Sequence, residues 1–485
     1  MGSNNNNNNN NNNNMIVLYP SPAMGHLISM VELAKLILTH HPSLSITILM
    51  TTPPYNTGST SPYINHVSKT IPLIHFHHLP IISLPLNSTS SPHHEALAME
   101  LLHLNNPHVH HALLSLSQAS TIRAFIIDFF CCVSFDVARE LGIHTYLYCT
   151  SGAACLGLFL YFPTLHNTTT KSFRELDNGT LDVPELPPIP GKDMPKPMLD
   201  RFDKAYEGFL YMAMKMPKSK GIIINTFESL EYRAITAIRD GLYVNPSPPI
   251  HCIGPLIASA DHNEGREEEK RCRSWLDSQP TRSVVFLCFG SLGLFSMEQL
   301  REIAIGLERS EQRFLWVVRS PPVDDQMERL LVAPPEPTLQ TLLPEGFLDR
   351  TKDRGLVVKS WAPQVKVLSH VSVGGFVTHC GWNSILEALR AGVPMVAWPL
   401  YAEQRFNRVV MVEEMKLCLS MEELEGSDGL VSAEEIDRKV RQVLIDSQLR
   451  ERTMEARESA KAALSDEGSS LKALDELAKS WMSSE

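Results

Sequence analysis

A chain of 485 residues is longer than the roughly 250–300 residues at which a single hydrophobic core stops growing, so we expect two domains. Hydrophobic residues make up 43% and charged residues 20% of the chain, which is typical of a soluble globular protein and excludes a disordered or fibrous one. The 43 Lys and Arg residues against 54 Asp and Glu residues leave a net charge of −11, which argues against nucleic acid and anionic membrane surfaces as partners.

The nine cysteines are scattered along the chain without a CxxC pair. This distribution argues against a zinc site and a disulfide framework, and it favours the reducing environment of the cytoplasm. The longest apolar stretch, residues 153–162, is about half as long as the ~20 residues that a membrane span needs, so we expect no transmembrane helix.

Residues 1–14 consist of Met-Gly-Ser and an unbroken run of asparagines, and we expect them to be a disordered leader outside the fold. The fold then begins with a short apolar run at residues 16–19, which predicts a buried strand. A helix follows, because apolar side chains from Leu27 to Leu38 recur at every third or fourth position, and residues 45–49 return as a strand. Strand, helix and strand in this order predict a parallel sheet with right-handed crossovers.

The same pattern begins again at residues 284–287, where a buried strand leads to a helix that starts with a capping box at Ser296 and Gln299. The fold class is therefore α/β, with two Rossmann-like, doubly wound parallel sheets. Further strands of the second sheet are predicted at residues 314–318, 356–358, 375–378 and 395–398.

We expect the N-terminal domain to span residues 15–248 and the C-terminal domain to span residues 271–465. Residues 249–270 have the proline-rich and charged composition of a linker. Residues 466–485 include an amphipathic terminal helix, which we expect to pack back on the N-terminal domain. The sequence suggests no self-complementary apolar surface, so we expect a monomer.

A dense group of polar residues follows the predicted strand that ends at Thr378. Residues 379–383 form a tight turn, and a helix begins at Ser384. Free N–H groups and the helix dipole converge at such a turn, which predicts an anion site that fits a diphosphate. The turn lacks the GxGxxG fingerprint, and the chain contains no P-loop motif. Taken alone, Ser384 and Glu387 also fit a simple capping box, and Trp361 fits ordinary core packing.

The segment WAPQVKVLSHVSVGGFVTHCGWNSILEALRAGVPMVAWPLYAEQ occupies residues 361–404. It closely resembles the donor-binding signature of plant secondary-product UDP-glycosyltransferases. The resemblance covers residues 15–485 and implies the GT-B fold, in which an acceptor-binding N-terminal domain and a UDP-sugar-binding C-terminal domain face each other across a cleft. Shorter matches to the family flank the signature at residues 25–26 (GH), 225–227 (NTF), 275–277 (WLD) and 289–291 (FGS).

The resemblance implies a role for several residues of the signature. Trp361 would stack its indole on uracil, with the Ala362 backbone and Gln364 at the polar edges of the base. Glu387 would accept hydrogen bonds from the two ribose hydroxyls. These residues would hold the nucleoside end of the donor.

The diphosphate and the sugar would lie further along the same site. The family pattern implies that His379, Asn383, Ser384 and Ser291 hold the diphosphate, together with main-chain N–H groups at the turn of Gly381. Trp382, Glu403 and Gln404 would face the sugar, and Thr150 would contact the sugar or a phosphate. In this family Gln at position 404 goes with glucose and His with galactose, and Arg in place of Trp382 goes with glucuronic acid, so both positions indicate glucose. Asp is more frequent in the family where Glu403 stands.

Two residues of the N-terminal half stand at predicted strand ends. His26 follows Gly25 after the first strand, and Asp128 ends the apolar run of residues 124–127. The carboxyl ends of parallel strands meet at one edge of a sheet, so both side chains should face the cleft. Without the resemblance, His26 would more often be structural and Asp128 a strand-end cap. The resemblance implies a catalytic pair, in which the carboxylate orients the imidazole and stabilises its protonated form.

The resemblance therefore implies an inverting glucosyltransferase that forms a β-glucoside on a phenolic acceptor from UDP-glucose. Residues 126–132 and the YAEQ ending are similar to the subgroup that acts on chalcones, isoflavones and related phenols. Transfer to an aryl carbon remains open, as does a catalytically silent UDP-sugar-binding protein, whereas the missing glycine fingerprint disfavours a nicotinamide-dependent oxidoreductase. No two aspartates have the Asp-x-Asp spacing of metal-dependent glycosyltransferases, so we expect no metal and no cofactor besides the donor substrate.

Overall fold

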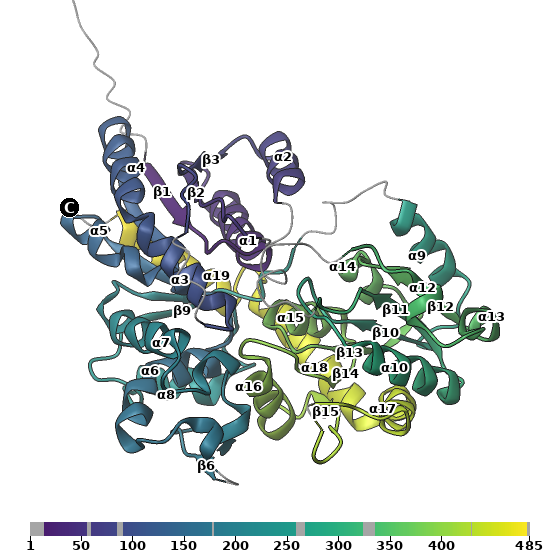
Figure 1. Cartoon of the computed structure of the whole chain (residues 1–485). Coiled ribbons are helices and arrows are strands. Elements are labelled where there is room, and N and C mark those ends of the chain that lie inside the picture. The colour runs from purple at the N-terminus through teal and green to yellow at the C-terminus, as the bar shows by residue number, and fades with distance from the viewer. Residues whose placement is uncertain are drawn as a thin grey trace, which may run out of the picture.

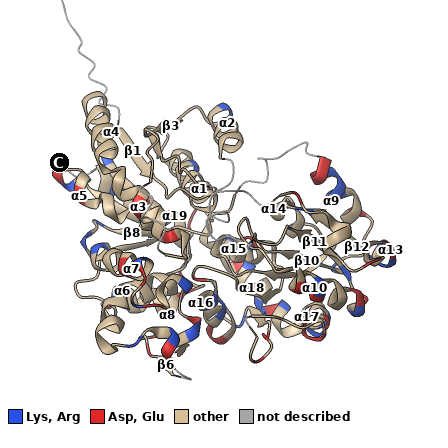
Figure 2. Ribbon diagram, viewed as in Figure 1, with Lys and Arg blue, Asp and Glu red and all other residues tan. Residues whose placement is uncertain are grey.

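The computed structural model describes residues 14–55, 60–84, 91–176, 179–258, 267–323, 335–427 and 429–482. These residues form two α/β lobes, each built around a parallel sheet with helices packed against it (Figure 1). Residues 1–13 of the expected leader and residues 259–266 of the expected linker lie outside the described residues. Acidic and basic residues are interspersed along the ribbons of both lobes (Figure 2).

The first sheet has the strand order β3-β2-β1-β4-β5-β8-β9, with every neighbouring pair parallel. Alternate residues of one strand point to opposite faces, so Val17 and Tyr19 join one buried cluster while Ile16 and Leu18 join another. Because both faces are covered, these strands are continuous apolar runs. The strands are β1 (Asn14–Tyr19), β2 (Ser45–Met50), β3 (Ile74–His78), β4 (Thr121–Asp128), β5 (Thr145–Cys149), β8 (Ile222–Ile224) and β9 (Ile250–Cys252).

Helices of the N-terminal lobe connect these strands and cover the sheet. A short antiparallel hairpin, β6 (Thr180–Leu181) and β7 (Ile189–Pro190), precedes α7. The helices are α1 (Met24–His40), α2 (Ser61–Thr70), α3 (His94–Leu104), α4 (Asn106–Ala119), α5 (Phe135–Glu140), α6 (Ala153–Thr168), α7 (Lys204–Lys215) and α8 (Tyr232–Arg239).

The second sheet has the strand order β12-β11-β10-β13-β14-β15, and its neighbouring pairs are also parallel. Two buried clusters cover its two faces. The strands are β10 (Val284–Cys288), β11 (Arg313–Val318), β12 (Gly355–Lys359), β13 (Val373–Thr378), β14 (Met395–Ala397) and β15 (Cys418–Ser420). The helices are α9 (Glu267–Asp277), α10 (Met297–Ser310), α12 (Leu339–Leu342), α13 (Phe347–Thr351), α14 (Gln364–Leu368), α15 (Trp382–Ala391), α16 (Gln404–Val409), α17 (Ala433–Ile445) and α18 (Ser447–Ala463).

In both sheets the chain reverses its winding direction after the third strand of the lobe and returns to the other side of the first strand. In the first sheet the reversal lies between β1 and β4, and in the second it lies between β10 and β13. Open α/β sheets bind ligands outside the carboxyl ends of the strands at such a switch point. The two switch points therefore mark where a site should form. The predicted fold class of two doubly wound parallel sheets is confirmed.

The capping box that we predicted for α10 forms only in part. The Ser296 hydroxyl accepts a hydrogen bond from the Gln299 N–H (3.2 Å), as a helix cap does. The Gln299 side chain does not return to Ser296, because its amide exchanges two hydrogen bonds with the Val431 backbone instead (2.9 and 2.8 Å). A long-range contact thus takes the place of the second half of the local motif.

The structure differs from the expected division of the chain at two places. Asn14, which we assigned to the leader, is the first residue of β1 and pairs with Thr121. Residues 250–252, which we assigned to the linker, form β9 and pair with β8 at the edge of the first sheet. Both departures arise because the end residue of a strand and a three-residue edge strand depend on a distant partner strand and carry little local pattern.

The terminal helix α19 (Ser469–Met482) packs on the first sheet and not on the lobe that immediately precedes it in the chain (Figure 1). Leu474, Leu477 and Trp481 are fully buried in the cluster that also contains Ile126 and Tyr146. The Trp481 ring meets the Tyr146 ring edge-on, with 6.2 Å between the centroids. None of the described helices is both long and apolar enough to cross a membrane.

We expect Trp481→Ala to lower the free energy of unfolding of the N-terminal lobe by about 3–5 kcal/mol, because it removes a fully buried aromatic side chain and leaves a cavity. Urea unfolding followed by circular dichroism measures the change. Met482→Ala is the matched control, since the Met482 side chain is exposed. Equal stability of the two variants would contradict the packing of α19 described above.

Candidate active site

Three neighbouring strands of the first sheet bring His26, Asp128 and Thr150 together. His26 lies in the first turn of α1, directly after β1, while Asp128 ends β4 and Thr150 follows β5. The His26 Nδ1 lies 2.7 Å from Asp128 Oδ2 and 3.3 Å from the Thr150 hydroxyl oxygen. The predicted pair therefore meets at the switch point of the first sheet.

The Asp128 carboxylate is held on both sides. It is fully buried, and its second oxygen accepts a hydrogen bond from the Phe130 N–H (3.0 Å). An Nδ1–H that donates to this carboxylate leaves Nε2 of His26 as the nitrogen that can accept a proton. Burial lowers the pKa of His26, but the charge of Asp128 and its hydrogen bond act in the opposite direction, and the pKa of His26 is raised above its ordinary value.

Aromatic side chains surround His26 on the side of the lobe interior. The rings of Phe129 and Phe130 lie 6.0 and 5.5 Å from the imidazole, measured between centroids. Phe159 stacks on Phe129, and Phe209 contacts both Phe130 and Phe159. Phe130 is only partly buried. The imidazole thus stands at the edge of an apolar aromatic cluster whose rings are tilted against one another.

The switch point of the second sheet contains the residues predicted to hold the diphosphate. His379 follows β13 and is buried against Gly290 and Gly381. The contact is close, since a Cβ atom added to Gly290 or Gly381 would lie only 2.6 or 2.5 Å from Nε2 of His379. Gly290 also has a φ of +72°, which only glycine adopts without strain. Burial lowers the pKa of His379 to about 4, so this imidazole is neutral near pH 7. Among the described residues, none pairs with its Nδ1.

The N-terminus of α15 lies at the boundary between the lobes (Figure 1). Its N-cap is Gly381, and within the described residues no side chain caps the first turn. The Asn383 amide donates a hydrogen bond to the carbonyl of Gly25 across the boundary (3.3 Å). The side chain of Asn383, the second residue of this ten-residue helix, therefore brings the open helix end next to the residue before His26. Such a helix end attracts an anion through its N–H groups and its dipole.

The residues that we predicted to hold the nucleoside lie beside the same helix in the second lobe. The Gln364 amide nitrogen lies 2.8 Å from the Ser384 hydroxyl and 2.7 Å from Glu387 Oε2. Burial raises the pKa of Glu387 to about 7, and the hydrogen bond from Gln364 opposes that rise. Trp361 is partly exposed and lies outside the buried clusters, while the neighbouring Ala362 is buried. The capping-box interpretation of Ser384 is wrong, because Ser384 is the third residue of α15 and not its cap.

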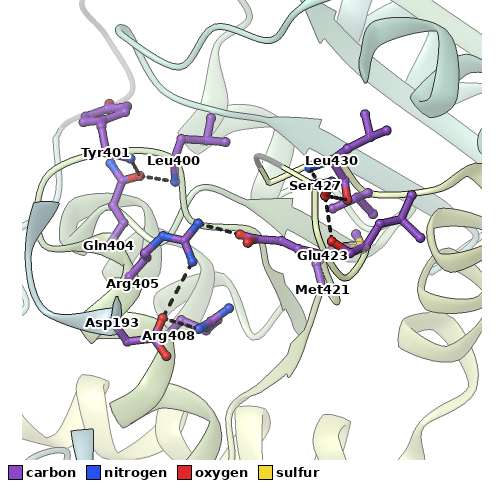
Figure 3. A network of polar contacts seen from close by, with 12 residues as sticks. Asp193, Leu400, Tyr401, Gln404, Arg405, Arg408, Met421, Glu423, Ser427 and Leu430 are labelled. Carbon is purple, nitrogen blue, oxygen red and sulfur yellow. Dashed lines mark hydrogen bonds and ion pairs between the residues drawn. The ribbon is translucent and has the colours of Figure 1, made fainter. Parts of the chain in front are cut away.

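The last two residues of the signature, Glu403 and Gln404, form a corner at the start of α16 that faces the first lobe. The Gln404 side-chain oxygen accepts hydrogen bonds from the N–H groups of Leu400 (2.9 Å) and Tyr401 (3.0 Å), which fixes its orientation (Figure 3). The Glu403 carboxylate accepts a hydrogen bond from the hydroxyl of Ser151 in the first lobe (3.4 Å). Burial raises the pKa of Glu403, although the charge of His26 works against the rise.

Comparisons with known proteins decide the family. A family model described as UDP-glucoronosyl and UDP-glucosyl transferase matches residues 221–458. UDP-glycosyltransferase 88B1 of Stevia rebaudiana is 51% identical over 468 residues, which cover 96% of this chain and 98% of that protein. The chain belongs to the UDP-glycosyltransferase family.

Two further relatives bear on the fold and the chemistry. Isoflavone 7-O-glucosyltransferase 1 of Glycine max is 47% identical and covers 97% of this chain and 99% of that protein. The structure of Phytolacca americana UGT2 complexed with UDP-2fluoro-glucose and pterostilbene is 38% identical, with a TM-score of 0.85, and covers 96% of this chain and 99% of that chain. This likeness confirms the predicted GT-B fold.

Trp382, which we predicted to face the sugar, also contacts the first lobe of this glycosyltransferase. Its indole N–H donates to the Asn225 carbonyl (2.7 Å) and its side chain is buried. The indole also packs close to Gly152, where a Cβ would lie 2.7 Å from the ring. The indole N–H is thus committed to the contact between the lobes. Ser291, by contrast, is exposed in the loop after Gly290.

Two buried residues near the boundary, Glu231 and Asn225, were not predicted to have a role in the site. Glu231 accepts hydrogen bonds from the N–H groups of Ala153 and Ala154 (2.7 and 2.9 Å) and so caps α6. The Asn225 side-chain amide donates a hydrogen bond to the Leu256 carbonyl (3.2 Å), and its oxygen accepts one from the Leu256 N–H (2.7 Å). Asn225 directly follows the apolar run of residues 222–224, and this position would have been a usable signal, whereas the partner of Glu231 is 77 residues away in sequence.

We expect Asp128→Asn to lower the pKa of His26 because the nearest charge that opposes the effect of burial is removed. A histidine NMR titration of this glycosyltransferase, with the His26 signal assigned through a His26→Gln variant, measures the change. Asp437→Asn, which removes a partly exposed carboxylate from an ion pair in the other lobe, is the control. An unchanged or raised His26 pKa in Asp128→Asn would show that another group sets it.

Proposed function

We propose that this enzyme is an inverting glucosyltransferase that transfers glucose from UDP-glucose to a phenolic hydroxyl and forms a β-glucoside. The observation that carries this proposal is the contact between the Asn383 amide and the Gly25 carbonyl. Through it, the open end of α15 lies next to the residue that precedes His26. A base and an anion site that meet in this way can act on the two sides of one sugar carbon.

In the proposed reaction His26 is the general base. Its Nε2 takes the proton of the acceptor hydroxyl while the oxygen attacks the anomeric carbon, and the bond from that carbon to the diphosphate breaks on the opposite face. Asp128 orients the imidazole and stabilises the imidazolium that forms. An α-linked donor then yields a β-linked product and UDP, and His26 later releases its proton to solvent.

The negative charge of the departing UDP must be stabilised as the bond breaks. We assign this task to the N–H groups at the start of α15, with Asn383, Ser384, Ser291 and the neutral His379 around them. The described residues contain no group of three His, Cys, Asp or Glu side chains arranged to hold a metal ion. The proposal therefore uses fixed dipoles for this charge.

The donor would extend from this point in two directions. Uracil would lie on Trp361, and the ribose hydroxyls would hydrogen-bond to Glu387, whose contact with Gln364 shows that the carboxylate faces a polar partner at this position. The sugar would face Glu403 and Gln404 at the boundary with the first lobe. The Gln404 oxygen is held by the backbone, which leaves its amide N–H₂ to donate to a sugar hydroxyl.

The acceptor would lie against the aromatic cluster beside His26. Phe129 and Phe130 offer ring faces and edges to a flat aromatic molecule, with the imidazole at their border. An isoflavone glucosyltransferase and a structure complexed with pterostilbene are among the relatives. These names support a phenolic acceptor for this enzyme.

The direct test incubates the enzyme with UDP-glucose and a panel of phenols, and follows UDP release and product mass. We expect glucose transfer, and we expect His26→Ala to lower the rate by about 10²–10⁴-fold because it removes the general base. His103→Ala, which changes an exposed histidine of α3, should keep full activity. Product NMR distinguishes an O-glucoside from a C-glucoside, and binding of UDP-glucose without transfer to any phenol would indicate a silent binding protein.

A second test concerns the leaving group. Because fixed N–H groups and not a bound cation stabilise UDP in this proposal, we expect the transfer rate to stay the same when excess EDTA is present. The assay compares initial rates with and without the chelator after the protein has been dialysed against it. A loss of activity that added Mg²⁺ or Mn²⁺ restores would refute this part of the proposal.

A further inference from the structure

A buried ion-pair network joins the two lobes beside the corner that carries Glu403 and Gln404 (Figure 3). Asp193 of the first lobe lies in a short turn before α7, and its carboxylate is only 4% exposed. Its Oδ1 accepts a hydrogen bond from Arg408 Nη2 (2.6 Å) and lies 3.7 Å from Arg405 Nη1. Both arginines belong to α16 of the second lobe and are 16% exposed.

The network continues into the second lobe. Arg405 Nη2 donates to Glu423 Oε1 (2.6 Å), so this guanidinium lies between one carboxylate from each lobe. A planar guanidinium with several N–H groups can hold two partners in a fixed geometry, which an ammonium group does less well. We call Asp193, Arg405, Arg408 and Glu423 the domain latch.

The domain latch is continuous with the corner at residues 401–404. Arg405 directly follows Gln404, and the backbone N–H of Lys196, three residues after Asp193, donates to the carbonyl of Ala402 (3.0 Å). On the opposite side of α16, the Asn407 amide donates to the carbonyl of Cys380 in the diphosphate turn (2.9 Å). The start of α16 is therefore held by the first lobe on one side and by the diphosphate turn on the other.

At the other end of the proposed donor site, the side-chain hydrogen bonds of Gln364 stay within the second lobe and join α14 to Ser384 and Glu387 of α15. A change at Asp193 should thus disturb the place of the sugar relative to His26 and leave the nucleoside contacts unchanged.

We propose that Asp193, Arg405 and Arg408 are positioning residues that fix the sugar-facing corner over His26, so that they control the transfer of the sugar and not the binding of the nucleotide. This inference rests on the proposed function of the site. The buried carboxylate is shared by two cations, and loss of its charge leaves two mostly buried guanidinium groups without their counter-charge from the first lobe. The corner then loses its fixed distance from the first lobe.

The test compares Asp193→Asn and Arg408→Gln with the parent enzyme in steady-state kinetics and in calorimetric titrations with UDP and with UDP-glucose. We expect each variant to lower kcat by roughly 10–100-fold, the cost of a small misplacement of reacting groups. Affinity for UDP should remain unchanged, while affinity for UDP-glucose falls relative to it. The double variant should be no slower than the slower single variant, since both remove the same contact.

Two controls separate this role from simple stabilisation. Glu308→Gln breaks an ion pair with Arg350 inside the second lobe and should change neither kcat nor the two affinities. Arg408→Lys keeps the charge, so this variant should retain a higher kcat than Arg408→Gln. The comparison of these two arginine variants tests the inference even if Asp193→Asn fails to fold.

The inference would be overturned if kcat were unchanged in the variants. It would also be overturned if the ratio of UDP affinity to UDP-glucose affinity equalled that of the parent enzyme. In either case the domain latch would only hold the two lobes together. The affinity ratio needs no turnover. It therefore reports on the latch even where the parent enzyme transfers glucose to none of the phenols, a result that would refute the proposed function instead.

Discussion

The contact between the start of α15 and the turn before His26 is the constraint on which the rest of the site depends. Each sheet alone brings polar residues to its own switch point, but neither group can act on a bond between two substrates. The Asn383 amide and the Gly25 carbonyl join the two groups directly. The Trp382 indole, which donates to the Asn225 carbonyl, adds a second contact across the same boundary. A helix end suited to an anion thereby lies beside an imidazole suited to a proton.

The surroundings of the two imidazoles in this region shift their pKa values in opposite directions. Burial lowers the pKa of both, but only His26 has a buried carboxylate within hydrogen-bond distance, so its pKa is raised while that of His379 falls to about 4. A neutral His379 can donate or accept a hydrogen bond beside a phosphate without taking a proton from it. Opposite environments thus suit the two residues to opposite tasks.

Most of the fold was predictable from sequence because the central strands are long apolar runs and the helices between them are periodic. The signature at residues 361–404 and the two strand ends at His26 and Asp128 likewise indicated the main residues of the candidate site. What the sequence did not show depends on distant partners. Residues 250–252 are a strand only because β8 lies beside them, Trp382 turns to Asn225 across the boundary, and Asp193 meets arginines more than 200 residues away in the chain. Local pattern carries no information on such pairings.

The most direct measurement is a crystal structure of the enzyme with a non-transferable fluoro analogue of UDP-glucose and a phenol bound together. The account predicts uracil on the Trp361 ring, and the phenol oxygen within hydrogen-bond distance of His26 Nε2. That oxygen should lie about 3–3.5 Å from the anomeric carbon, on the face opposite the diphosphate. A sugar carbon out of reach of the phenol oxygen, or a phenol oxygen that contacts a different base, would contradict it.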